Sequence, residues 1–287
     1  IYDASDEEAV EVFRRLNKGG NPLREGDVRA AELARGKPVR VLKDMRHFVT
    51  QQRPLRLGFG FSFAFRALVV FHTRSAQFSR LKPNWMEVPG PHDRALADSW
   101  RATEKALNAA LKFIDEEMGW SRRGLVPTSN AIIVLSIAFD KARHKVNAEM
   151  ARLFRRWLCL TALRGAFQAS VETTINGFAR AIRESKAHPA VSLVRSLKRD
   201  GRRIRNDELY DYGQMWGPAT LVMHSWLVHQ KARDWVTGDT IDALARTGSA
   251  GLPAGDLTVH HIFAREVLAK RRVHPDDANS PCNYALL

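Results

Sequence analysis

Apolar side chains recur at helical spacing over long stretches of this chain, and this periodicity limits the possible folds more than any other feature. From residue 95 to 118, the residues Trp100, Leu107, Leu111, Ile114 and Met118 follow one another at intervals of three, four or seven. That spacing places them on one face of a helix and predicts an amphipathic helix buried along that face. Further helices are predicted over residues 6–16, 27–35, 59–71, 129–139, 146–167, 172–185, 189–199, 218–229 and 240–245. The expected fold class is therefore mainly α.

Strand signal is confined to the C-terminal part of the chain, at residues 257–262 and 283–287. A run rich in glycine and alanine, residues 247–255, precedes the first of these segments and is typical of a linker. We therefore expect a small terminal module over residues 247–287 that is separate from the helical part.

The chain is strongly basic, with 45 Lys and Arg against 31 Asp and Glu and a net charge of +14. This excess favours a polyanionic partner, with nucleic acid first and a membrane surface second. The apolar runs are too short to span a bilayer, so we expect no membrane protein. Two cysteines provide no disulfide framework, and a reducing, cytoplasmic compartment fits them best.

Two adjacent histidines, His260 and His261, end the first predicted strand, and Asn283 begins the second. A site for phosphodiester hydrolysis needs a metal ligand beside a general base, and imidazole has a suitable pKa for the base. A side-chain amide can accept from an imidazole N–H without becoming charged, so Asn283 fits the group that orients the base. Chance adjacency is the alternative, because the chain has ten histidines. A structural zinc site that uses Cys282 has poor tetrahedral spacing.

The segment His260-His261-Ile262-Phe263 and the later run from Asn279 to Leu287 together resemble the C-terminal HNH module of GmrSD-type, modification-dependent restriction endonucleases. The resemblance implies a ββα-metal hairpin in which His261 is the general base, His260 a metal ligand and Asn283 the supporting Asn, with Mg²⁺ or Mn²⁺ as cofactor. The chain has Ala264 where the family has proline. The helix with the last metal ligand is expected after Leu287, so we expect a truncated hairpin and a chain that is inactive by itself.

The segment from Phe13 to Leu23, with Asp27 after it, resembles the end of the ParB-like N-terminal domain of the same family. Its Asn-Lys-Gly-Gly turn exposes backbone N–H groups, which makes Arg15, Asn17 and Gly20 candidates for contact with a nucleotide or phosphate. A tight helix–helix turn is the alternative. In the family, an Asp-Gly-Gln-Gln-Arg motif lies upstream of such a segment, and this chain has no counterpart of it there. NTP hydrolysis is therefore expected in a full-length protein only.

The helical middle resembles the linker region of the family, and the predicted domains are residues 1–45, 46–246 and 247–287. A basic cluster lies between the two halves of the nuclease motif and is predicted to contact DNA phosphates; it comprises Arg265, Lys270, Arg271 and Arg272. Four tryptophans, Trp100, Trp157, Trp216 and Trp226, are expected in the core rather than as platforms for base stacking.

These features predict part of a DNA endonuclease that restricts modified foreign DNA, as in phage defence, by metal-assisted hydrolysis. The competing hypothesis is a non-catalytic helical scaffold for DNA binding or assembly with a degenerate HNH module. The sequence leaves open the DNA modification, the metal, the NTP and whether a homodimer forms to cut both strands.

Overall fold

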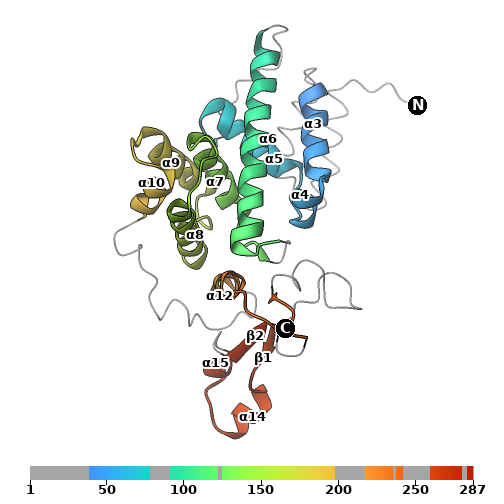
Figure 1. Ribbon diagram of the computed structural model, residues 1–287, viewed down its shortest axis with the longest axis vertical. Helices are drawn as coiled ribbons and strands as arrows, with labels where there is room; N and C mark the ends of the chain where they lie inside the picture. Colours follow the sequence, from blue (N-terminus) through green and yellow to red (C-terminus); the bar gives the residue numbers. More distant parts are fainter. Residues whose placement is uncertain are drawn as a thin grey trace, which may run out of the picture. The chain divides into compact units, whose positions relative to one another are not determined.

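The structure is a computed structural model, and it describes residues 39–77, 91–121, 125–197, 217–234, 237–241, 259–279 and 283–286. These residues are mainly helical, which confirms the predicted fold class (Figure 1). The helices are α3 (Val39–Thr50), α4 (Gln52–Arg56), α5 (Phe61–Thr73), α6 (Pro91–Met118), α7 (Ser129–Lys141), α8 (Ala148–Leu163), α9 (Val171–Glu184), α10 (Pro189–Ser196), α12 (Pro218–His229), α14 (Arg265–Lys270) and α15 (Pro275–Ala278). The two strands are β1 (Val259–His261) and β2 (Tyr284–Leu286).

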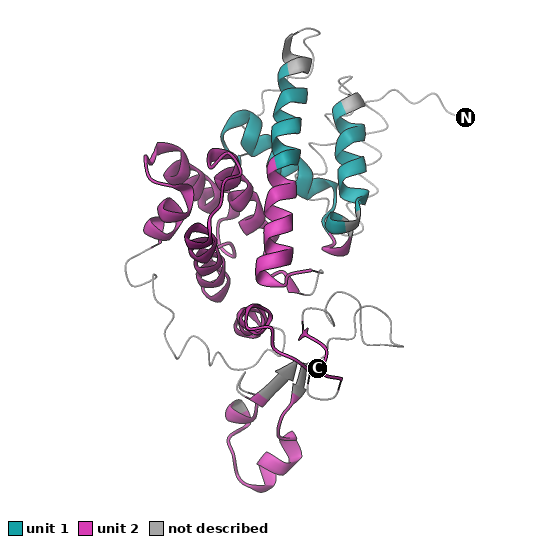
Figure 2. Ribbon diagram, in the orientation of Figure 1, with its two compact units in different colours: residues 1–55, 59–105 teal, residues 56–58, 106–287 magenta. Residues whose placement is uncertain are grey.

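The chain divides into two compact units, and the boundary between them falls inside α6 (Figure 2). Unit 1 comprises residues 1–55 and 59–105, and unit 2 comprises residues 56–58 and 106–287. The domain limits predicted at residues 45 and 246 stay predictions, because residues 1–38 and 242–258 lie outside the described residues.

The core of unit 1 lies between α3, α5 and the first half of α6. The ring of Phe48 on α3 meets the indole of Trp100 on α6 edge to face, with 5.7 Å between ring centroids. Nδ1 of His72 on α5 lies 3.0 Å from Oγ of Ser99 on α6. An apolar contact and a polar contact therefore fix α6 against two other helices of this unit.

In unit 2, α7, α8, α9 and α10 pack on one another around a core rich in aromatic rings. Phe113 of α6 contacts Phe139 of α7 and Phe154 of α8, with centroids 5.5 and 5.9 Å apart. The side chains of Thr128 and Asn147 accept backbone N–H groups at the starts of α7 and α8. Each cap satisfies a donor that the first turn of a helix leaves without a partner.

The predicted inward face of α6 is confirmed, because its five apolar residues are all at most 1% exposed.

The helix predicted over residues 218–229 coincides with α12. Trp226 on this helix was expected in the core, and that expectation is wrong: its side chain is 60% exposed. The fully buried side chains of α12 end at Ser225, and in the last turn Leu227 and Val228 are half-buried while Trp226 faces solvent. Trp216 lies outside the described residues.

Among the described helices, none combines the length and the apolar character that a bilayer crossing needs.

Candidate active site

The two predicted strands form an antiparallel pair, with His260 opposite Ala285 and His261 opposite Tyr284. A further hydrogen bond, 2.7 Å from Ile262 N to Asn283 O, extends the pairing past the end of β1. The connection between the strands carries the short helices α14 and α15 (Figure 1). His261 and Asn283 therefore lie at the same end of the strand pair, as the spacing of the motif predicts.

The imidazole of His261 is partly exposed and has a polar neighbour. Its Nε2 lies 3.3 Å from Oδ1 of Asn279, the residue directly after α15. Because an amide oxygen only accepts, a hydrogen bond between these two atoms requires that Nε2 carry the proton. A ring held in one tautomer and open to solvent has the properties that a general base needs.

Asn283 is buried, and its amide uses one acceptor and two donor positions on the backbone around the site. Its Oδ1 accepts from Phe263 N at 2.8 Å, while Nδ2 donates to Phe263 O at 3.0 Å and to Ala278 O at 2.8 Å. The residue thus joins the turn after β1 to the end of α15.

The structure differs here from the expectation that Asn283 orients the imidazole of His261. The amide that faces the ring is that of Asn279, and the described contacts of the Asn283 amide go to the main chain. The physical reason is the burial of Asn283, since a buried amide must satisfy its donors locally and the two nearby carbonyl oxygens accept them. Asn279 stands in the motif, but nothing in its spacing from His261 identifies it.

A metal site is not complete among the described residues, where no group of three or more His, Cys, Asp and Glu side chains gathers. His260 contributes its backbone to β1, and its side chain lies outside the described residues. Its role as a metal ligand therefore stays a prediction. Burial raises the pKa of Cys159 on α8 to about 12, so this thiol is protonated at neutral pH.

The four residues of the predicted DNA-binding cluster are all exposed on α14 and the turn after it; they are Arg265, Lys270, Arg271 and Arg272. Arg272 has a left-handed backbone with φ of 59°, which ends the helical segment. Long cationic side chains on a solvated surface are accessible to phosphate groups. The predicted phosphate contacts at Arg15, Asn17 and Gly20 lie outside the described residues.

No protein-family model and no curated protein matches this chain.

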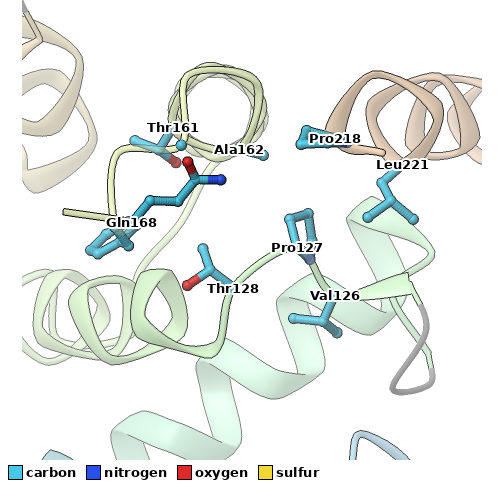
Figure 3. A pocket seen from close by; sticks show the side chains of 10 residues that line it. Val126, Pro127, Thr128, Thr161, Ala162, Gln168, Pro218 and Leu221 are labelled. Atoms are coloured by element: carbon cyan, nitrogen blue, oxygen red, sulfur yellow. The ribbon is translucent and has the colours of Figure 1, made fainter. Parts of the chain in front are cut away.

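A cavity of about 400 Å³ lies elsewhere in unit 2, and no pattern in the sequence predicts it. Figure 3 shows Thr128, Thr161 and Gln168 around it, with Pro218 and Leu221 of α12 also in its wall. The remaining lining residues are Val126, Pro127, Ala162, Gly165 and Phe167. The described lining residues have no ionisable side chain, and we assign the candidate active site to the strand pair.

Proposed function

We propose that this chain is part of a metal-dependent DNA endonuclease in which His261 is the general base. The observation that carries the proposal is the contact of His261 Nε2 with Asn279 Oδ1 at the end of β1. The contact places the amide oxygen of Asn279 beside one ring nitrogen, and the imidazole is partly exposed. Its neutral ring takes a proton from a water molecule that attacks a phosphodiester.

The electrostatic setting supports a nucleic acid substrate. Four exposed cations follow His261 within eleven residues of the chain, on α14 and the turn after it. Contacts of this kind add affinity for any sequence, because they neutralise phosphates and release counterions. The net charge of +14 acts in the same direction over the whole molecule.

His260 is the ligand that we propose for a divalent ion, Mg²⁺ or Mn²⁺. When bound, such an ion stabilises charge on the phosphoryl oxygens. The finer part of the proposal is restriction of modified foreign DNA, and it rests on the resemblance of the terminal segments to the GmrSD-type family.

The alternative is a helical scaffold that binds DNA without cutting it, and the net charge of +14 fits DNA binding in either case. Incubation with supercoiled plasmid and Mg²⁺ or Mn²⁺ separates the two functions. The protein is expressed together with any natural sequence that flanks it. The nuclease proposal requires nicks that His261→Ala abolishes, whereas a scaffold binds the plasmid and leaves it intact.

A further inference from the structure

Large apolar side chains are exposed directly beside the candidate base. Ile262 is 42% exposed, Phe263 is 62% exposed and Val267 is 49% exposed, and we call these three residues the apolar patch. Isolated exposed apolar residues are ordinary on protein surfaces. The patch is different because its members fall within six residues of the chain and begin one residue after His261. Such a group marks a surface for binding.

Phe263 is held in place although its ring is exposed. Asn283 binds both its N–H, at 2.8 Å, and its carbonyl oxygen, at 3.0 Å. Because Asn283 is only 7% exposed, this anchor is protected from water. The ring is therefore carried by a fixed backbone, and less conformational entropy is lost when it binds a partner.

The charges around the apolar patch indicate what binds there. Between Ile262 and Val273 the chain has four cations, all exposed, and a single acid, Glu266. A partner that matches this surface has negative charges close to flat apolar faces. Nucleic acid has both, since bases stack on aromatic rings and phosphates pair with lysine and arginine.

We propose that Phe263 stacks on a DNA base beside the phosphate that His261 acts on. Two residues of extended chain span at most about 7 Å, so the ring and the imidazole reach neighbouring nucleotides. A base must leave its own stack to meet the ring, which favours single strands, mismatches and distorted duplexes. Phe263 is in this proposal a determinant of substrate choice, and the inference rests on the proposed nuclease function.

The test is binding of fluorescein-labelled oligonucleotides, measured by anisotropy for the full chain at several salt concentrations. Phe263→Ala is expected to weaken binding of a single strand about tenfold, with a smaller loss for an intact duplex. Phe263→Trp keeps an aromatic face and is expected to bind at least as well as the wild type. Phe263→Leu keeps apolar area without a ring and is expected to behave like the alanine variant.

The salt dependence separates stacking from charge. Phe263→Ala is expected to leave the negative slope of log K against log salt unchanged, whereas Arg271→Ala is expected to reduce the magnitude of that slope by about one. Because the ring of Phe263 is exposed, its truncation is expected to preserve the fold, and circular dichroism of each variant checks this.

Several results would overturn the proposal. If the wild type and Phe263→Ala bind single strands equally well, Phe263 does not stack, although the nuclease function stands as long as His261→Ala abolishes nicking. If Phe263→Leu binds like the wild type, the patch supplies apolar area only. If the protein binds vesicles of phosphatidylserine and phosphatidylcholine through Phe263 but binds no DNA, both the stacking and the nuclease function are wrong.

Discussion

The side-chain amide of Asn283 and the backbone of Phe263 form a reciprocal pair, in which Oδ1 accepts from Phe263 N and Nδ2 donates to Phe263 O. The same Nδ2 also donates to Ala278 O. One buried side chain thereby closes the connection between β1 and β2 at two points. The strands themselves are only three residues long, so we expect this pair to contribute much of the stability of the module.

Asn283→Ala is expected to destabilise the strand pair by about 1–3 kcal/mol, because it removes the partner of one backbone N–H, that of Phe263, and of two carbonyl oxygens, those of Phe263 and Ala278. Asn283→Asp is expected to be at least as harmful, since it points a carboxylate at two carbonyl oxygens. Hydrogen exchange of the Ile262 and Phe263 amides measures the effect locally. Asn108→Ala is the matched substitution at an exposed position of α6, and it is expected to change neither amide. Unchanged protection in both Asn283 variants would contradict this role.

The contact of Asn279 with His261 predicts the tautomer of the imidazole. In the wild type, ¹⁵N NMR of neutral His261 is expected to show the proton on Nε2, and Asn279→Ala is expected to give a mixture of tautomers. We expect Asn279→Ala to lower the rate of nicking more than DNA binding, because it changes the orientation of the base rather than the phosphate contacts. A wild-type ring with its proton on Nδ1 would contradict the geometry.

Glu104 on α6 makes the stability of unit 1 depend on pH. Burial, with a further contribution from the charge of Asp44 on α3, raises the pKa of Glu104 above its ordinary value of 4.5, and His47 opposes the shift. The folded state thus binds a proton more tightly than the unfolded state, and this residue lowers stability as pH rises from about 4.5 through the raised value. Below 4.5 both states are protonated and the effect disappears.

Denaturant unfolding of the wild type and Glu104→Gln at pH 4 and pH 7 checks this dependence. The variant is expected to gain stability relative to the wild type as pH rises, and Asp44→Asn is expected to reproduce part of the gain. A constant difference between wild type and Glu104→Gln over this range would show that the carboxyl is not shifted.

Two glycines in unit 2 are expected to respond to alanine in opposite directions. Gly119, after α6, has φ of +66°, and a Cβ on it would lie 2.5 Å from Cγ2 of Val228. Gly177 lies inside α9, and a Cβ there meets no atom within 4 Å. Gly119→Ala is therefore expected to destabilise the protein by about 1–3 kcal/mol. Gly177→Ala is expected to stabilise it by about 0.5–1 kcal/mol through helix propensity. Thermal unfolding compares the two, and a Gly119→Ala variant as stable as the wild type would contradict the close approach of Val228 to Gly119.

The parts of the fold that could be predicted from the sequence are those with sustained periodicity. The apolar face of α6 runs from Trp100 to Met118, about five turns, and leaves little choice of structure. The helix α3 was not predicted, although Leu42, Met45 and Phe48 have helical spacing and are buried. Valines and threonine at its ends weaken the helical signal, and packing against α5 compensates.

The candidate site shows a different limit of sequence reasoning. The two strands follow from two short apolar segments, and the structure pairs them antiparallel. The helices α14 and α15 have six and four residues, too few for a periodic pattern, and they were not predicted. They decide which amide reaches the imidazole, because Asn279 follows α15 directly. The spacing of the motif therefore identifies His261, but it does not identify Asn279 as the residue that contacts its imidazole.

The most direct test of the account compares the wild type with His261→Ala in DNA binding and in plasmid nicking with Mg²⁺ or Mn²⁺, with each protein carrying any natural flanking sequence. We expect the wild type to nick the plasmid and His261→Ala to bind DNA with similar affinity and to leave it intact. Nicking by His261→Ala at the wild-type rate would contradict the account, and so would a wild type that binds DNA and cuts it with neither metal.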